Sequence, residues 1–101
     1  MITIYSKDGC PYCVKAKDLL EQYSIDFNEV RIDEDELAKK FVVGEGHRTV
    51  PQLYVNKTLL VEGGYDGLNA MTQELIETRV TNIMDAQWYR FTKIPSIVLS
   101  Y

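Results

Sequence analysis

The tetrapeptide Cys10-Pro11-Tyr12-Cys13 constrains this chain more than any other feature of its sequence. It follows an alternating apolar and polar stretch at residues 2–5, which predicts a strand, and the break Lys7-Asp8-Gly9. Pro11 suits the first position of a helix, because its fixed φ fits there and its missing N–H would have no partner anyway. We therefore expect a strand-to-helix junction with Cys10 as the N-cap residue.

This junction gives the two cysteines different chemistry. The Cys10 sulfur can accept hydrogen bonds from the free N–H groups of Tyr12 and Cys13, and it lies at the positive end of the helix dipole. Both effects favour thiolate over thiol, and Lys7 is a further nearby cation. Cys13, one turn into the helix, is expected to be more buried. Cys10 would then attack a disulfide, and Cys13 would resolve the mixed disulfide that results.

Two cysteines at this spacing also permit other interpretations. Half of a zinc site would need two more ligands, and the chain offers His47 and otherwise only carboxylates or a second chain. Covalent haem attachment requires His after the second cysteine, where Val14 stands. Two inert core cysteines remain an alternative, although Pro11 between them makes a poor core-filling pattern. Redox chemistry accounts best for the motif, and no metal site is expected.

The rest of the sequence alternates between helix and strand signals. The helix after Gly9 carries its apolar residues at helical spacing: Cys13, Ala16, Leu19, Leu20 and Tyr23. Residues 27–32 predict a second strand. Asp33 followed by Glu36 has the spacing of a capping box and predicts the start of a second helix, which Gly44 and Gly46 end. The buried stripe of this helix is expected to consist of Leu37, Ala38 and Phe41.

Two short apolar runs then predict a hairpin, at residues 50–55 and 59–61 around Asn56-Lys57-Thr58. After Gly63-Gly64, a further helix is expected to begin near Asp66. Its inward-facing residues would be Leu68, Met71, Leu75 and Ile76. The order β-α-β-α-β-β-α predicts an α/β fold, with a mixed sheet and helices on both of its faces.

The pattern is weaker from Glu77 onward. Apolar residues there can continue a helical stripe until Pro95: Val80, Ile83, Met84, Trp88 and Phe91. Residues 97–99 would form a short strand. We expect this aromatic-rich tail to cover the core, with a partner or dimer surface as the alternative. The chain would then be a single domain over residues 1–101, with a core at about 1–76 and a C-terminal extension at 77–101.

Composition narrows the classes of partner. The 101 residues carry 11 Lys and Arg against 15 Asp and Glu, and the net charge of −4 argues against nucleic acid or an anionic membrane. No apolar run approaches the roughly 20 residues of a membrane span. The first residues also lack the pattern of a secretory signal, so we expect a cytoplasmic protein. Two cysteines are too few for a disulfide scaffold of this size.

At three places the chain resembles the dithiol glutaredoxins. Cys10-Pro11-Tyr12-Cys13 after a first strand resembles their active site. Thr49-Val50-Pro51-Gln52 resembles their cis-proline loop, and Gly63-Gly64-Tyr65-Asp66 resembles the turn that holds the glutamyl end of glutathione. The likeness covers roughly residues 1–76. It implies a thioredoxin-like fold, with a mixed four-stranded sheet flanked by helices and followed by the C-terminal extension.

The resemblance also implies the ligand-binding residues. A cis Val50–Pro51 bond would turn the Val50 backbone toward an extended ligand, whereas a trans proline at a strand start is the alternative. Close backbone approach at Gly64 would admit the ligand, and Asp66 would meet its ammonium group unless it is only a helix cap. Gly67 stands where the family often has a second Asp. The full glutathione set is expected to be Lys7, Tyr12, Arg48, Thr49, Val50, Pro51, Gly64, Tyr65 and Asp66.

In this interpretation Lys7 and Arg48 would bind the glycyl carboxylate, and Tyr12 would flank the thiolate. The resemblance implies glutathione-dependent reduction of protein disulfides and glutathione mixed disulfides, with glutathione as co-substrate and no permanently bound cofactor. Partners would be disulfide-containing or glutathionylated proteins, with ribonucleotide reductase as one candidate, and we expect a monomer. Two alternatives remain: an iron–sulfur carrier, which Pro11 disfavours, and a redox adaptor whose tail docks one partner.

Overall fold

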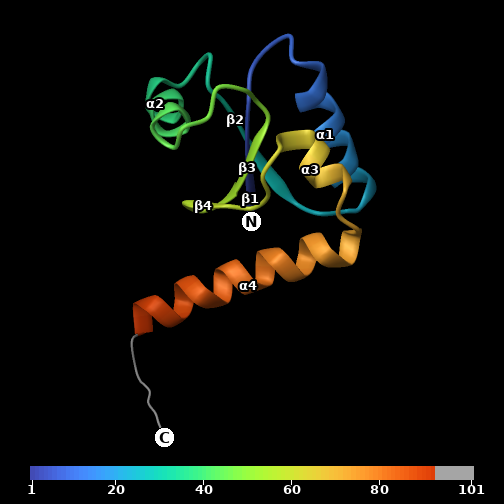
Figure 1. Cartoon of the computed structure of the whole chain (residues 1–101), viewed down its shortest axis with the longest axis vertical. Helices are drawn as coiled ribbons and strands as arrows, with labels where there is room; N and C mark the ends of the chain where they lie inside the picture. Colours follow the sequence, from blue (N-terminus) through green and yellow to red (C-terminus); the bar gives the residue numbers. More distant parts are fainter. Residues whose placement is uncertain (93–101) are drawn as a thin grey trace, which may run out of the picture.

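The structure is a computed structural model that describes residues 1–92, with side chains up to residue 86. Its elements are β1 (Ile2–Ser6), α1 (Pro11–Gln22), β2 (Phe27–Arg31), α2 (Glu36–Gly44), β3 (Gln52–Val55), β4 (Thr58–Leu59), α3 (Gly64–Asn69) and α4 (Gln73–Thr92) (Figure 1). The expected stop at Pro95 and the strand at 97–99 lie outside the described residues, as do the side chains of Trp88 and Phe91.

The four strands form one mixed sheet, as predicted, and their order in it is β2-β1-β3-β4. β1 runs parallel to β2 and antiparallel to β3, and β3 runs antiparallel to β4. Ile4 at the centre of the sheet pairs with Glu29 on one side and Leu53 on the other. β1 and β3 are therefore the two inner strands, and the loops at their ends carry the motifs that the sequence singled out.

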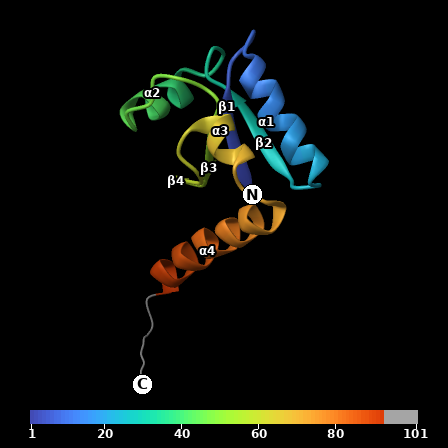
Figure 2. The same cartoon turned by 45° about the vertical axis from the view of Figure 1, so that its right-hand side comes forward.

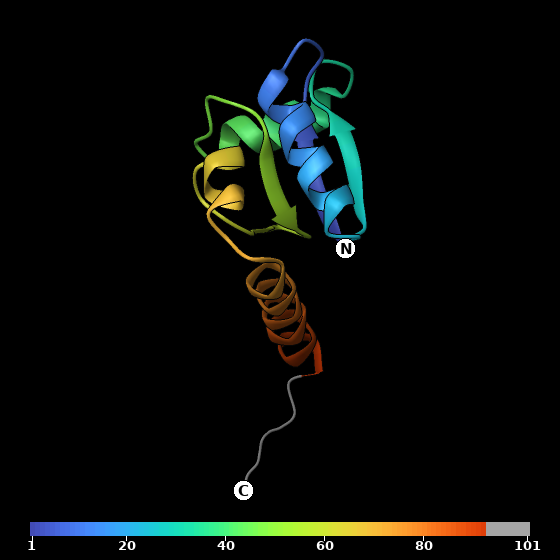
Figure 3. The same cartoon turned by 90° about the vertical axis from the view of Figure 1, so that its right-hand side faces the viewer.

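Helices cover both faces of the sheet. α1 and α3 lie side by side on one face, whereas α2 lies on the other (Figures 1 and 3). Strand alternation explains the division, because neighbouring side chains of β1 point to opposite faces. Ile2 and Ile4 point into the main core, while Tyr5 packs against Phe41 of α2 and Tyr54 of β3, with ring centroids 5.6 and 5.7 Å away.

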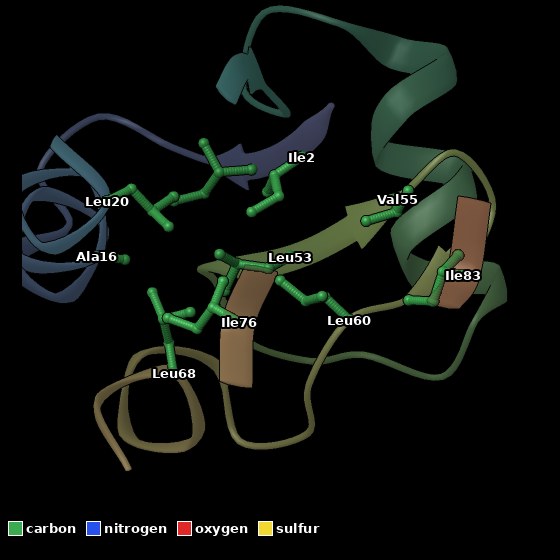
Figure 4. Packing of buried hydrophobic residues seen from close by; sticks show 10 residues of the cluster. Ile2, Ala16, Leu20, Leu53, Val55, Leu60, Leu68, Ile76 and Ile83 are labelled. Carbon is green, nitrogen blue, oxygen red and sulfur yellow. The ribbon is translucent and has the colours of Figure 1, made fainter. Parts of the chain in front are cut away.

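The main core joins β1, β3, α1, α3 and α4. Its members are Ile2, Ile4, Ala16, Leu20, Leu53, Val55, Leu60, Leu68, Ile76 and Ile83, of which Leu60 directly follows β4. Figure 4 labels nine of them and shows these side chains pointing toward one another. The helical spacing predicted for α1 is confirmed, since Cys13, Ala16 and Leu20 are buried. Leu19 and Tyr23 pack on the same cluster. This core anchors the start of α1 and therefore the position of its first turn.

The start and the buried face of α2 differ from the sequence-based prediction. The N-cap is Asp35, whose carboxylate accepts from the Ala38 N–H at 3.0 Å, because the side chain of Asp33 is bound by Arg31. Leu37 was expected to be buried and is 77% exposed, whereas Val42 is the buried residue of this helix. The later start places Leu37 on the solvent side of the first turn.

The predicted helix near Asp66 is in fact two helices. α3 ends at Asn69, and α4 starts after Thr72, whose hydroxyl accepts from the Leu75 N–H at 3.1 Å. This break changes the direction of the chain, so Leu75 is exposed instead of buried as predicted. The hairpin is also tighter than predicted, because Thr58 already pairs with Val55 and the turn consists of Asn56 and Lys57.

α4 extends away from the sheet and passes the N-terminal end of β1 (Figures 1 and 2). Its buried residues are Ile76 and Ile83, and Val80 packs partly against the core. Arg79 donates to the carbonyl oxygen of Leu60 at 3.1 Å. Of the predicted stripe, Met84 is 46% exposed and does not join the core. Within the described residues, no helix is both long and apolar enough to cross a membrane.

Candidate active site

The first turn of α1 holds the two cysteines as the sequence predicted. Cys10 is the N-cap with extended backbone, Pro11 is the first helical residue, and the Cys10 sulfur accepts from the Cys13 N–H at 3.2 Å. A matching bond from Tyr12, which we also expected, is not seen among the described residues. Cys10 and Cys13 form a disulfide, with their Cα atoms 5.2 Å apart.

The two sulfurs differ in access. Cys13 lies on the buried face of α1 and is 2% exposed, whereas Cys10 is only half-buried. A reaction partner approaching from solvent therefore meets Cys10 first. Disulfide exchange needs the attacking sulfur to reach one sulfur of the disulfide and displace the other, so access alone divides the roles. Cys10 is the sulfur that can form a mixed disulfide with an outside molecule, and Cys13 is placed to displace that molecule.

The loop before β3 lies directly opposite Cys10. The Val50–Pro51 peptide bond is cis, as predicted, and the Val50 carbonyl oxygen lies 3.6 Å from the Cys10 sulfur. Gln52 is buried and donates its side-chain amide to the Thr49 carbonyl at 3.0 Å, which holds the loop in shape. The structure thus brings two segments, forty residues apart in sequence, to the same edge of the sheet.

The Gly63-Gly64 turn completes this edge. Gly64 has a φ of +57°, and a Cβ on it would lie 2.7 Å from the Pro51 carbonyl oxygen. Only glycine lets the turn approach the proline loop this closely. Gly67, where the resembling family often has Asp, is restricted in a similar way, because a side chain there would overlap the Glu62 carbonyl oxygen.

A groove of about 240 Å³ runs between these segments. Its lining is Tyr12, Thr49, Val50, Pro51, Gly63, Gly64, Tyr65 and Asp66. Seven of these are residues that the sequence analysis expected at the site, and they come from α1, the proline loop and α3. The structure therefore brings most of the predicted ligand-binding residues together.

Lys7 and Arg48 lie in a neighbouring hollow instead. This hollow, of about 340 Å³, also includes Lys39 and His47, and it shares Thr49 and Val50 with the groove. The two predicted cations are therefore separated from Asp66 by the width of the proline loop. A ligand that contacts both the cations and Asp66 would have to lie across Val50.

A hydrogen-bonded cluster that the sequence did not predict supports the proline loop. His47 Nε2 lies 2.6 Å from the hydroxyl of Tyr54, which donates to the Glu45 carboxylate at 3.3 Å. Tyr54 is 1% exposed, and burial together with Glu45 raises its pKa to about 12, so its hydroxyl stays protonated at neutral pH. The cluster ties the loop between α2 and β3 to the strand that follows it. Only the folded loop and strand bring these three side chains together.

The loop before Cys10 is fixed by the carboxylate of Asp33, which closely follows β2. Asp33 receives two hydrogen bonds from the Arg31 guanidinium, at 2.9 and 2.7 Å, and one from the Asp8 backbone N–H at 3.2 Å. The Arg31 hydrogen bonds lower the pKa of Asp33 to about 2. The carboxylate therefore stays charged at neutral pH and holds the segment that leads to the reactive sulfur.

Side chains of the kinds that hold metal ions do not cluster in the described part of the chain. Within residues 1–86, no group of three or more His, Cys, Asp and Glu side chains is close enough together to hold an ion. The chemistry that the described side chains support is disulfide exchange at Cys10 beside a groove with a backbone-lined floor.

Comparison with known proteins decides the family. The sequence profile of the glutaredoxin family matches residues 2–60. A glutaredoxin of Pseudomonas aeruginosa is 38% identical over 71 residues, which is 69% of this chain and 82% of that protein. This chain belongs to the glutaredoxin family. Glutaredoxin 3 of Escherichia coli is 35% identical over 71 residues, covering 69% of this glutaredoxin and 83% of that one.

A solved structure shows the fold of this glutaredoxin. The structure of a buckwheat glutaredoxin–glutathione complex superposes with a TM-score of 0.64 over 80% of this chain and 76% of that one, at 21% identity. The fold is thioredoxin-like, as predicted. Glutaredoxins are thiol–disulfide oxidoreductases, and the Cys10–Cys13 pair fits their dithiol motif.

Proposed function

We propose that this glutaredoxin reduces glutathione mixed disulfides and protein disulfides, with glutathione as the electron donor. The observation that carries the proposal is the half-buried Cys10 sulfur beside a groove lined by the cis-proline loop and the Gly63-Gly64 turn. Two of the lining residues are Gly63 and Gly64, which can present only backbone to an extended tripeptide. The buckwheat relative was solved in complex with glutathione, which supports the choice of ligand.

In the proposed reaction, the Cys10 thiolate attacks the glutathione sulfur of a mixed disulfide. A bond forms between Cys10 and glutathione, and the protein thiolate leaves. A second glutathione thiolate then attacks that glutathione sulfur, which releases oxidised glutathione and restores the Cys10 thiolate. With a protein disulfide, Cys10 bonds to one protein sulfur and the other leaves as a thiolate. Cys13 then attacks Cys10, which releases the second protein thiolate and forms the Cys10–Cys13 disulfide seen here. Two glutathione molecules reduce this disulfide to the dithiol and leave as oxidised glutathione.

The groove would hold glutathione so that its sulfur meets Cys10. The Val50 backbone would pair with the cysteinyl backbone of the ligand, while Tyr12 and Tyr65 would form its aromatic wall. Asp66 would bind the ammonium group at the glutamyl end, with Thr49, Pro51 and Gly64 shaping the floor. Lys7 and Arg48, across the proline loop, would receive the glycyl carboxylate.

We expect the protein to act as a monomer in the cytoplasm, where glutathione keeps thiols reduced. It would need no permanently bound cofactor. Its protein substrates would be glutathionylated or disulfide-containing proteins, with ribonucleotide reductase as a candidate. The division into a core at about 1–76 and an extension at 77–101 remains part of this proposal.

The test is glutathione-dependent reduction of a small mixed disulfide by the full chain and by two variants. Cys10→Ser should have no activity, because no other cysteine is exposed to the substrate. Cys13→Ser should keep substantial activity, since glutathione alone can release the product from Cys10.

A protein that is inactive with glutathione but is reduced by a thioredoxin reductase would overturn the proposal. In that outcome the fold and the redox role of Cys10 would stand, but the electron donor would be different. Equal loss of activity in both variants would instead contradict the separate roles of the two cysteines.

A further inference from the structure

A lysine that the reaction does not use lies beside the aromatic wall of the groove. The rings of Tyr12 and Tyr65 are stacked, with centroids 6.1 Å apart and planes 28° from parallel. The ammonium of Lys15 lies 5.3 Å from the Tyr12 centroid and 5.9 Å from that of Tyr65. It is thus almost equally distant from both rings, within the range of cation–π attraction.

The helix explains why Lys15, and not its neighbour, occupies this place. Lys15 follows Tyr12 by three residues, so the two share one face of α1. Lys17 lies on a different face and forms an ion pair with Glu29 at 2.9 Å. Within residues 1–86, Lys15 forms no salt bridge, so its charge is free for an outside anion.

The groove itself contains one charged side chain, which is negative. Among its lining residues Asp66 is the one acidic or basic residue, and it directly follows Tyr65. The glutamyl end of glutathione is a zwitterion, with an α-ammonium and an α-carboxylate on one carbon. Asp66 can match the ammonium, but no lining side chain matches the carboxylate. Lys15 is the cation held beside two residues of this wall.

We propose that Lys15 is a specificity-determining residue that attracts the α-carboxylate of the glutamyl end, so that Lys15 and Asp66 together select an unmodified zwitterionic end group. This inference rests on the proposed function. The stacked tyrosines keep the ammonium near the groove, and its attraction to the carboxylate is that of an exposed ion pair, because Lys15 is exposed. Such pairs contribute about 0.2–1 kcal/mol, which corresponds to a rate effect of up to about fivefold.

The experiment compares three thiols, each joined to 2-thiopyridine in a mixed disulfide. Attack by Cys10 on the sulfur of the thiol releases 2-thiopyridone, which is followed by its absorbance. The first is glutathione. The second is glutaryl-Cys-Gly, which lacks only the α-ammonium, and the third is 4-aminobutyryl-Cys-Gly, which lacks only the α-carboxylate. All proteins carry Cys13→Ser, so the reaction stops when Cys10 has displaced one thiopyridone. The measured quantity is the second-order rate constant.

Lys15→Gln should lower the rate constant about two- to fivefold for glutathione and for glutaryl-Cys-Gly. It should leave the rate constant for 4-aminobutyryl-Cys-Gly unchanged. The matched control is Lys57→Gln, because Lys57 lies 5.0 Å from the Phe41 ring in another cation–π pair, away from the groove. This control should change none of the three rate constants.

A Lys15→Gln variant that loses the same factor with all three disulfides, or loses none with any, would overturn the inference. A different result would contradict the proposed function. In that case the Cys13→Ser protein that keeps Lys15 would react no faster with the glutathione disulfide than with the corresponding disulfide of 2-mercaptoethanol. The two failures are therefore distinguishable in one set of measurements.

Discussion

Gly64 carries two constraints at a single residue. Its φ of +57° lies in the left-handed region, and its missing Cβ leaves room for the Pro51 carbonyl oxygen. A side chain at this position would push apart the turn and the proline loop, which form two walls of the groove. The width of the groove therefore depends on Gly64 having a hydrogen atom where alanine would have a methyl group.

Gly64→Ala should lower the free energy of unfolding by about 1–3 kcal/mol, because it adds left-handed strain and a contact at 2.7 Å. It should also reduce activity with glutathione by widening the groove. Chemical denaturation and steady-state kinetics measure the two effects.

The control for this variant is Gly44→Ala. Gly44 ends α2, and a Cβ on it would have no heavy atom within 4 Å, so alanine there should leave stability unchanged or slightly raised. Equal stability of the two variants would show that the Gly64 contact is relieved at no cost.

At the scale of elements, the loop between β1 and α1 depends on the loop between β2 and α2. Asp33 connects them, since it binds both the Arg31 side chain and the Asp8 backbone. The same carboxylate explains the corrected start of α2, because Asp33 is occupied and Asp35 caps the helix. The Asp33 carboxylate can either cap α2 or bind Arg31 and the Asp8 N–H. The local sequence pattern does not show which of these partners it binds in the fold.

This contact predicts how stability changes in acid. The pKa of Asp33 is lowered to about 2 in the folded protein, against an ordinary value near 4, so the folded state favours the charged carboxylate. Its contribution is fully present above about pH 4 and is lost as the pH falls through 2. Glu29, whose pKa is lowered by hydrogen bonds from Ser6 and Lys17, acts in the same direction.

At pH 5, Asp33→Asn should therefore be less stable than the wild-type protein. When the pH is lowered from 5 to 2.5, its free energy of unfolding should fall by less than that of the wild-type protein. Urea midpoints at the two pH values measure this difference. Asp18→Asn, at an exposed residue with no ion pair in the described structure, should follow the unchanged protein. An identical acid decline in the Asp33 variant would contradict the role of this carboxylate.

At the scale of the whole molecule, α4 is attached to the body mainly through its first three turns. Ile76 and Ile83 point into the core (Figure 4), Val80 packs against it, and Arg79 binds the backbone after β4. The helix therefore crosses residue 76, where we placed the end of the core, without a break. Its first half contributes to the packing of the sheet.

Ile83→Ala should lower the free energy of unfolding by about 2–5 kcal/mol, because it leaves a cavity at a residue that is 5% exposed. The neighbouring Met84→Ala should change stability by less than about 0.5 kcal/mol, since Met84 is largely exposed. Denaturant unfolding of both variants makes the comparison. Similar small losses in both would mean that α4 is not part of the cooperative fold at this position.

Several features followed from residues close together in the chain. Pro11 after Cys10 was sufficient to predict the helix start and the N-cap, because a cap acts within one turn. Helical spacing predicted the buried face of α1, and alternation predicted β1. The cis bond before Pro51 came from the family resemblance, and the structure confirms it. The resemblance predicted that Gly64 lets a ligand come close, whereas the structure shows its close approach to the Pro51 carbonyl oxygen.

Other features depended on how the folded chain starts its helices and arranges its loops. Leu37 and Leu75 looked like core residues but are exposed, because Asp35 and Thr72 start their helices at positions that turn these side chains outward. The His47–Tyr54 contact joins a loop to a strand. The sequence places a lysine near a tyrosine on α1, but α3 brings the second ring. Caps and periodicity act over a few residues, whereas burial and charge pairing depend on which surfaces the whole chain brings together.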